Sequence, residues 1–234
     1  MIVKLDMHCH SIASDGVFTM LELTSLAEKV GLAGLVLTDH CSPHDSFHTN
    51  LVILETLKQA GYHFPLPVIV GSEIKTPYGE FLLFGKKACE QWNQYKDRLW
   101  GIGNTFGVEQ YWQMFGKFVI GKHTILNESS VPDFTFGCTL DYALAICHPR
   151  SVTLSWCNKM PDMFWSMLNG FEIQNDYECY DASNPDVVDF FFKKINRCKY
   201  LRNTDCHADE LGRVYNEINL KEVTEDALIG WFRS

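Results

Sequence analysis

Two histidines lie two residues apart near the start of the chain, at His8 and His10, with the acidic residues Asp6 and Asp15 close by. The mostly apolar residues 1–5 before them predict a β-strand. Because side chains alternate between the two faces of a strand, His8 and His10 point the same way and can bind one cation together. Neutral imidazole binds zinc and also suits iron and manganese, and carboxylates add negative charge. The stretch indicates a metal site, although a His-x-His pair alone also fits an exposed strand end.

Polar motifs rich in His, Asp and Glu recur along the chain after short predicted strands, three of which are apolar runs typical of buried strands. They are Thr38-Asp39-His40 after residues 34–37, Gly71-Ser72-Glu73 after 67–70, His148-Pro149-Arg150 after 144–147, and Asp205-Cys206-His207 after 199–202. An open sheet would string these motifs along one edge, whereas a closed barrel gathers the carboxyl ends of its strands at one face. The pattern therefore favours a barrel.

Helix signals alternate with these strands. Thr19 and Glu22 have capping-box spacing ahead of an apolar stripe that predicts a helix ending at Gly31. Further helices are predicted over residues 50–59, over 187–196 and after Thr224, and further strands over 81–84 and 170–175. This alternation predicts an α/β protein with a parallel sheet.

Length and composition fit one domain. With 234 residues, of which 46% are apolar, the chain can bury a large core, so we expect a single barrel domain over residues 1–234 with an irregular insertion at about 86–140. No apolar run approaches the roughly 18 residues of a membrane span, and the N-terminus lacks the pattern of a signal peptide. Nine scattered cysteines without a C-x-x-C pair indicate reduced thiols. These features predict a soluble, cytoplasmic protein.

The net charge of −9 disfavours long nucleic acid as a partner, because no Lys/Arg cluster is visible along the chain. Small anions remain compatible with this charge, since bound divalent cations can outweigh acidic surroundings locally. We expect a small phosphorylated substrate and no membrane partner. The oligomeric state is not predictable from the sequence.

Taken together, the motifs resemble those of the PHP (polymerase and histidinol phosphatase) family of metal-dependent phosphoesterases. The resemblance spans almost the whole chain and rests on Asp-Met-His-Cys-His-Ser with Ser-Asp-Gly, Thr-Asp-His, Gly-Ser-Glu-Ile, Cys-His-Pro-Arg, and Asp-Cys-His with Glu-Leu-Gly-Arg-Val-Tyr downstream. It implies a distorted TIM-like (β/α)7 barrel that binds roughly two to three divalent metal ions, with zinc, manganese or iron as candidates.

The resemblance also implies a set of metal ligands that would form the catalytic centre. The ligands are His8, His10, Glu73 and Asp205 for one ion, Asp15, His40 and His207 for a second, and Glu73 with His148 for a third. The family usually supplies a further histidine to the third ion from the strand after the glutamate, and residues 78–83 contain none. His44, Glu80 and His123 are candidates to complete this site, although each residue also fits an ordinary surface position.

The expected activity is hydrolysis of small phosphate esters through a metal-bound hydroxide, because divalent ions polarise phosphoryl oxygens and lower the pKa of bound water. The chain has no G-x-S-x-G elbow and no convincing Cys-His pair, so neither a serine nor a cysteine nucleophile is expected. Arg150 and Arg213 are candidates for phosphate binding, since a guanidinium group matches phosphate geometry, and they fit structural ion pairs equally well.

Other functions stay open at this point. A nuclease acting on 3′ ends or a histidinol-phosphatase-like enzyme would use the same ligands, although the negative charge counts against long nucleic acid. A non-catalytic metal-binding module is the remaining alternative, which the nearly complete ligand set disfavours. Phosphate release and metal content, measured together, would separate these functions.

Three cysteines, Cys9, Cys147 and Cys206, adjoin implied ligands. Immediate neighbours on a strand face opposite ways, so these thiols should point away from the metals. We therefore predict a buried apolar role for all three.

Overall fold

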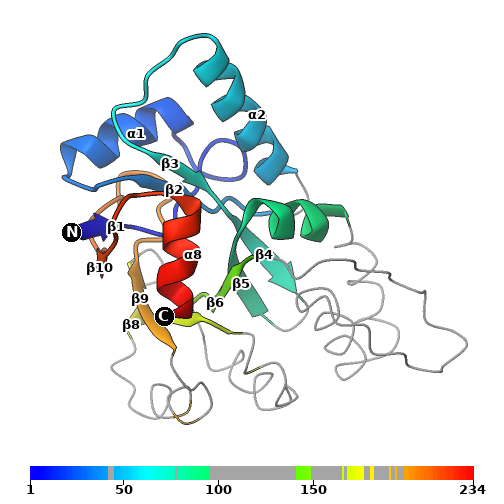
Figure 1. The fold of residues 1–234 in the computed structure, drawn as a ribbon, viewed down its shortest axis with the longest axis vertical. Helices are drawn as coiled ribbons and strands as arrows, with labels where there is room; N and C mark the ends of the chain where they lie inside the picture. Colours follow the sequence, from blue (N-terminus) through cyan, green and yellow to red (C-terminus); the bar gives the residue numbers. More distant parts are fainter. Residues whose placement is uncertain are drawn as a thin grey trace, which may run out of the picture.

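The computed structural model describes residues 1–41, 45–76, 79–94, 141–148, 165, 168–176, 180–181, 190, 193 and 198–234. His44, His123 and Arg150 lie outside these residues, as does most of the predicted insertion and of the predicted helix over 187–196. The helices are α1 (Met20–Lys29), α2 (Ser46–Gln59) and α8 (Glu225–Arg233), and residues 86–94 are also helical (Figure 1). No helix in the described part of the chain is long and apolar enough to cross a membrane.

The strands are short and mixed in direction. They are β1 (Ile2–Leu5), β2 (Leu35–Leu37), β3 (Val68–Val70), β4 (Ser72–Thr76), β5 (Gly79–Phe84), β6 (Ala143–Ile146), β7 (Gly170–Asn175), β8 (Tyr180–Asp181), β9 (Lys199–Asn203) and β10 (Asn216–Asn219). Every strand predicted from an apolar run is present. The sequence analysis missed β4, β8 and β10, which contain more polar residues.

Polar side chains begin the helices. Thr19 caps α1 in a reciprocal capping box with Glu22, and Thr224 caps α8, as predicted. Helix α2 starts earlier than the predicted Asn50, because the side chain of Asp45 accepts a hydrogen bond from the backbone N–H of His48 and forms the true N-cap.

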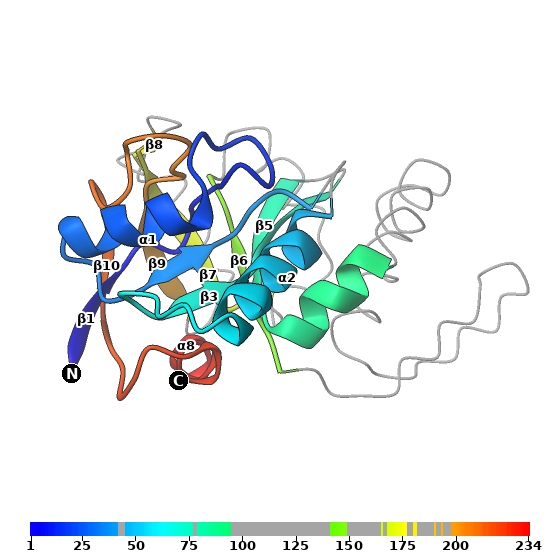
Figure 2. The same ribbon diagram turned by 90° about the horizontal axis from the view of Figure 1, so that it is seen from above.

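The prediction of a parallel sheet is only partly confirmed. Strands β2 and β3 are parallel, as are β6 with β7 and β7 with β9, but β4–β5, β5–β6, β7–β8 and β1–β10 are antiparallel. Only residues 77 and 78 separate β4 from β5, and so short a connection can join only antiparallel neighbours. The fold is therefore a mixed α/β fold with several sheets (Figure 2).

The ladders do not close a barrel among the described residues, so the predicted (β/α)7 barrel is not formed by continuous strand pairing. Isolated bridges connect the sheets instead. Cys9 pairs with Cys206 beyond β9, His40 pairs with Glu73, and the backbone N–H of Thr38 donates to the carbonyl of Cys9 over 2.9 Å. The segment after β1 thus lies between the ends of β2 and β9.

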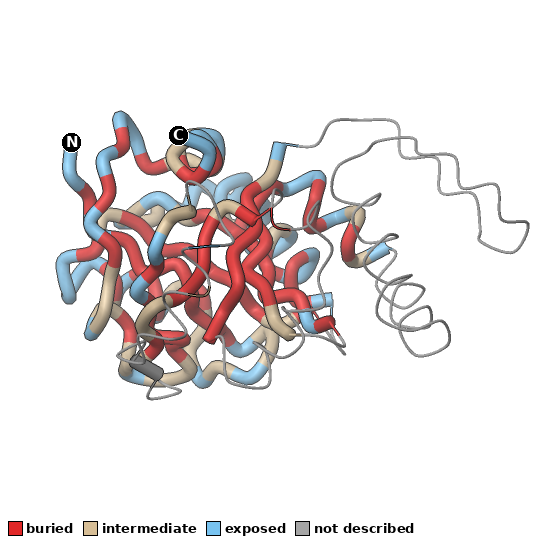
Figure 3. The backbone as a smooth tube through the Cα atoms, turned by 90° about the horizontal axis from the view of Figure 1, so that it is seen from below, coloured by how far each residue is buried: buried red, intermediate tan, exposed pale blue. Residues whose placement is uncertain are grey.

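Buried apolar side chains form two groups, because alternate residues of each strand face opposite sides. On β5, Phe81 and Leu83 belong to an outer group that includes buried residues of α1 and α2, whereas Leu82 and Phe84 belong to an inner group. The inner group comprises Val3, Leu5, Met7, Val36, Ile69, Leu82, Phe84, Ala143, Ala145, Cys147, Leu201, Ile218, Leu220, Val223, Leu228, Ile229 and Phe232. Figure 3 shows the central strands as the most deeply buried part of the chain.

Helix α8 covers one end of the inner group. The ring of Phe232 on α8 stacks on that of Phe84, with centroids 5.3 Å apart. Phe84 ends β5 and Ala143, also in the inner group, begins β6. Helix α8 therefore packs at the N-terminal end of β6. His148 follows the opposite, C-terminal end of this strand.

Candidate metal centre

The eight implied ligands lie together at the end of the strands opposite α8. Each side chain reaches this place from a strand or from the segment that follows one. His8, His10 and Asp15 follow β1, His40 follows β2, Glu73 lies on β4, His148 follows β6, and Asp205 and His207 follow β9. That they bind metal remains a prediction.

Four of these side chains form a fully enclosed group. Nε2 of His8 and Nε2 of His10 each lie 3.2 Å from Oε2 of Glu73 and 3.1 Å from Oδ1 of Asp205. All four residues are buried, yet none of these four atoms has a hydrogen-bond partner among the described residues. Buried polar atoms without partners are rare because they are costly. Two imidazole nitrogens and two carboxylate oxygens aimed at one point fit the ligand set of a divalent cation.

A second group lies at the rim, where Asp15 is half exposed. One carboxylate oxygen of Asp15 lies 3.4 Å from Nε2 of His40 and 3.4 Å from Nε2 of His207, and the other lies 3.5 Å from Nδ1 of His10. The ligand atoms of these four residues all lie within 4.8 Å of one another. This group can therefore hold a cation that stays accessible from solvent.

Glu73 connects the enclosed group to a third set of side chains. Its Oε2 lies 2.9 Å from Nδ1 of His40, and its Oε1 lies 3.0 Å from Nε2 of His148. Glu80 lies beside this pair, with Oε2 at 3.8 Å from Nε2 of His148. Glu73 can thus bridge neighbouring cations, as the resemblance implies.

For Cys147 the predicted burial among apolar side chains is confirmed, but the predicted direction of its side chain is wrong. Its sulfur lies in one group with the ring nitrogens of His8 and His148, and its side chain belongs to the inner group. The alternation argument fails because His148 has a φ of 24°, which breaks the regular strand directly after Cys147. Burial raises the pKa of Cys147 well above its usual value, so the thiol is neutral. Cys9 and Cys206 are free thiols packed in the outer group, as predicted.

The carboxylates dominate the electrostatics of the enclosed group. Burial lowers the pKa of His8, but attraction to Asp205, Glu172 and Glu73 outweighs burial and holds this pKa well above its usual value. The same balance, set by Asp205 and Glu73, raises the pKa of His10 to about 10. For Glu73 burial acts to raise the pKa, but the surrounding histidines hold it well below the usual range. The group thus has a strong affinity for positive charge, which protons or a metal ion can satisfy.

Glu172, on β7, is a site residue that the sequence analysis missed. Its side chain is buried, and Oε1 lies 2.8 Å from Nδ1 of His8. Oε2 accepts from the backbone N–H of His148 over 2.7 Å, and the side-chain amides of Asn175 and Asn203 donate to the same carboxylate. A glutamate between the apolar residues Phe171 and Ile173 of a predicted strand was the available signal. Glu172 orients His8 and His148 from behind.

A second buried carboxylate supports the rim. Asp39 accepts hydrogen bonds from the backbone N–H and the hydroxyl of Ser11, from the hydroxyl of Ser14 and from the amide of Asn50. These bonds fix the loop that carries Asp15 to the strand end that carries His40. Asp39 therefore supports the rim group indirectly, because its hydrogen-bond partners are Ser11, Ser14 and Asn50.

Arg213 was predicted either to bind phosphate or to form an ion pair. Its guanidinium group lies 3.1 Å from Oδ1 of Asp209 and 3.7 Å from Oδ2 of Asp176, and about half of the side chain is exposed. Two carboxylates already neutralise this cation. The geometry matches the ion-pair alternative.

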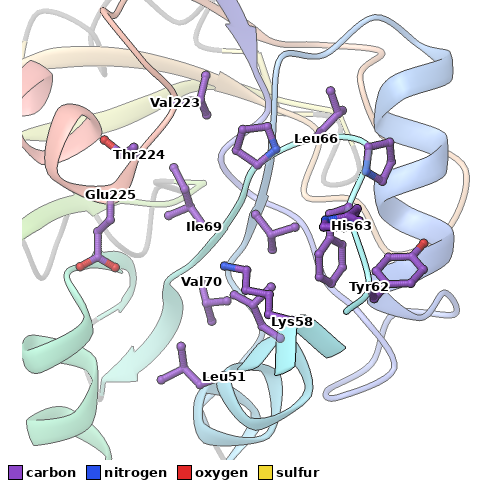
Figure 4. Close-up of a pocket in the computed structure, with 15 residues that line it drawn as sticks. Leu51, Lys58, Tyr62, His63, Leu66, Ile69, Val70, Val223, Thr224 and Glu225 are labelled. Carbon is purple, nitrogen blue, oxygen red and sulfur yellow. The ribbon is translucent and has the colours of Figure 1, made fainter. Parts of the chain in front are cut away.

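A pocket of about 590 Å³ lies elsewhere, against β3 and the start of α8. Its lining includes Leu51, Lys58, Tyr62, His63 and Glu225, and none of the implied metal ligands lines it (Figure 4). His63 is thus separate from the metal centre. The pocket adds no chemistry to the site.

No protein-family model matches the chain, and no curated protein matches it. Solved structures with a similar fold were found. One is a two-domain protein from Bacteroides vulgatus containing a predicted PHP-like metal-dependent phosphoesterase, at 18% identity and a TM-score of 0.51, over 89% of this chain and 53% of that one. Another is an amidohydrolase from Chromobacterium violaceum with bound sulfate and no metal, at 14% identity and a TM-score of 0.51, over 90% of each chain.

These likenesses concern the fold. The chain spans about half the length of the two-domain Bacteroides protein. At such identities the similarity shows a related arrangement of helices and strands, and the chemistry must be argued from the residues of this chain.

Proposed function

We propose that the chain is a metal-dependent hydrolase of small phosphate esters. The observation that carries this proposal is the enclosed group, in which four buried ligand atoms converge without hydrogen-bond partners. Such an arrangement is costly in the absence of a cation and favourable in its presence. The fold neighbours, a phosphoesterase-like protein and an amidohydrolase, are consistent with a hydrolase of this general kind.

In this proposal, two sets of residues would bind the metal ions. His8, His10, Glu73 and Asp205 would hold an ion in the enclosed group, and Asp15, His40 and His207 would hold one at the rim. When bound, divalent cations polarise a phosphoryl oxygen and supply a reactive water at neutral pH. Glu172 keeps Nε2 of His8 directed at the centre, and the accessible rim is where a substrate would enter.

Charge supports a small phosphate ester as the substrate class. Arg213, six residues after the rim ligand His207 in the sequence, already pairs with two carboxylates. Binding of an anion would therefore depend mainly on the bound cations, which favours a small ester over a long polyanion. A nuclease acting on 3′ ends is less well supported, because the net charge is −9, whereas a histidinol-phosphatase-like enzyme would also act on a small ester.

We also propose that the chain forms one distorted barrel over residues 1–234. Two isolated bridges support this proposal. The bridge between Cys9 and Cys206 joins the segment after β1 to the segment after β9, and the bridge between His40 and Glu73 joins the segment after β2 to β4. At both positions the described residues form a single bridge and not a continuous ladder, and implied metal ligands lie at or beside each bridge.

A phosphate-release screen tests the proposed function. The purified chain, with its metal content measured, would be offered phosphomonoesters, phosphodiesters and cyclic amides. We expect release of phosphate from small monoesters, and its loss in Asp205→Asn. Cleavage of amides alone would replace the phosphoesterase by an amidohydrolase. Bound metal without turnover of any ester or amide would favour the non-catalytic alternative.

A further inference from the structure

A groove of about 520 Å³ lies between helices α1 and α2, which are neighbours in Figure 1. Its walls are residues 11–13 after β1, residues 19–21 at the start of α1, and the face of α2 from Thr49 to Leu57. The surface of the groove is almost entirely apolar, and two of its side chains, Val52 and Ile53, are 47% and 38% exposed. Exposed apolar surface gathered in one groove is typical of a binding site.

Three of the polar side chains that line this groove already have partners within the protein. The hydroxyl of Ser11 and the side-chain amide of Asn50 both donate to Oδ2 of Asp39, over 2.8 and 2.6 Å. The hydroxyl of Thr49 donates to the carbonyl of Asp45 over 2.9 Å. These groups offer little to the hydroxyls of a sugar, which would give up hydrogen bonds to water on entering the groove. An apolar group loses no hydrogen bond there and gains from burial.

The groove is continuous with the loop that carries the rim ligand Asp15. The carbonyl of Ser11, in the wall of the groove, accepts hydrogen bonds from the backbone N–H groups of Ser14 and Gly16 over 3.1 and 3.0 Å. These bonds close a tight turn around Asp15. A Cβ atom at Gly16 would lie only 2.3 Å from the carbonyl oxygen of His10, so the turn packs closely against the enclosed group. A single turn therefore connects the wall of the groove to the rim.

Exposed apolar side chains also flank Asp15 in the sequence. Ile12, in the wall of the groove, is 58% exposed, and Val17 is 61% exposed. The backbone N–H of Val17 donates to the carbonyl of His207 over 2.8 Å, so Val17 is held beside a second rim ligand. The loop at the rim thus presents apolar side chains to solvent, and these suit the organic part of an apolar ester.

We propose that the groove binds the apolar organic group of the substrate while the phosphate group lies at the rim. The preferred substrates are then phosphate monoesters of alkyl alcohols and not phosphates of sugars. This inference rests on the proposed function and deepens it by naming the substrate class. The charged end of such an ester requires the bound cations, and its apolar end requires the groove.

A series of linear alkyl monophosphates tests the inference. Phosphate release from methyl, butyl and octyl phosphate and from a sugar phosphate would be measured below the concentration at which octyl phosphate forms micelles, with the metal content of each preparation matched. The variants Ile53→Asn and Ile12→Asn each replace an apolar wall of the groove by a neutral polar side chain. Val30→Asn is the matched control, because Val30 is an apolar residue at the end of α1 that is 44% exposed and does not line the groove. Thermal unfolding would establish that each variant is folded.

We expect kcat/KM to rise by at least about 100-fold from methyl to octyl phosphate, because each buried methylene group contributes about fourfold. The sugar phosphate should be a poorer substrate than octyl phosphate. In Ile53→Asn and Ile12→Asn the ratio of kcat/KM for octyl phosphate to that for methyl phosphate should fall by about tenfold or more. Val30→Asn should keep the ratio of the unmodified protein.

Equal kcat/KM for the methyl, octyl and sugar phosphates in the unmodified protein would overturn the role of the groove and leave the proposed function intact. An unchanged octyl-to-methyl ratio in the folded groove variants would overturn it as well, and if one variant does not fold, the other decides. A dimer that Ile53→Asn dissociates, with that ratio unchanged, would assign the groove to a second copy of the chain and overturn the inference. Absence of phosphate release from every ester would overturn the proposed function and this inference with it.

Discussion

Nδ1 of His8 lies 2.8 Å from Oε1 of Glu172, and both side chains are fully buried. The surrounding histidines hold the pKa of Glu172 below its usual value despite its burial, so this carboxylate is ionised and can only accept. Nδ1 of His8 therefore carries the proton in this contact. The consequence is that Nε2 faces the enclosed group, where a metal ion would need a lone pair.

Replacing Glu172 by glutamine should weaken metal binding. The amide retains the size of the side chain but has one oxygen, so it cannot accept from both His8 and the backbone N–H of His148. Loss of such a partner behind a metal ligand typically weakens metal affinity by about 10- to 100-fold. Isothermal titration of the metal-free protein with Zn²⁺ or Mn²⁺ measures this change, with Glu217→Gln, on β10 and outside the site, as the control. Unchanged affinity would show that Glu172 has only a packing role.

Asp205→Asn should abolish hydrolysis and preserve the fold. Asp205 has a φ of 54°, a left-handed conformation that asparagine tolerates better than alanine, so the substitution removes the charge with little backbone strain. Because Oδ1 of Asp205 faces both His8 and His10, we expect kcat/KM to fall by at least about 100-fold. Phosphate release and thermal unfolding would be measured together. Substantial activity in a folded variant would exclude Asp205 from the catalytic centre.

The strands and helix starts could be predicted where local signals were strong. The apolar run 81–84 and the cap at Thr19 are examples, because neither depends on distant residues. Strand β10 could not be predicted in this way. Its residues Asn216–Asn219 are mostly polar, and they form a strand because they pair with β1, more than 200 positions away. The direction of each strand likewise depends on its neighbours and not on its own sequence.

The ligand set could be anticipated from motifs, but its supporting residues could not. His8 and His10 carry their own signal through their spacing, whereas Glu172 acquires its role only when β7 is placed behind them. The error at Cys147 has a similar origin. Strand alternation predicts side-chain direction only for regular strand backbone. The positive φ of His148 interrupts the strand directly after Cys147, so the directions of these two side chains no longer alternate.

Arg213→Ala should leave KM for a small phosphate ester within about twofold of the unmodified value. The guanidinium group is half exposed and already lies near Asp209 and Asp176, so its loss should also cost little stability, about 1 kcal/mol or less. Steady-state kinetics with the best ester from the screen measures the effect. A rise in KM of about tenfold or more would instead assign Arg213 to phosphate binding.

Metal affinity should increase with pH above about 6.5, because a metal ion and protons compete for the same histidines. Attraction to Asp205 and Glu73 outweighs burial and raises the pKa of His10 to about 10, and the pKa of His8 also lies well above 6.5. A raised histidine pKa contributes stability to the metal-free fold that is complete below pH 6.5 and is lost as pH rises towards 10.

Glu73 and Asp205 have lowered pKa values and stay ionised throughout this window, so they add no pH dependence there. The gain in thermal midpoint on adding Mn²⁺ should therefore grow between about pH 6.5 and about pH 8.5, by about tenfold in affinity per pH unit for each proton displaced. Scanning calorimetry with and without Mn²⁺ measures this gain, and His10→Gln should reduce its slope by about one proton. A gain that does not change with pH in the unmodified protein would mean that no proton leaves these histidines when the metal binds.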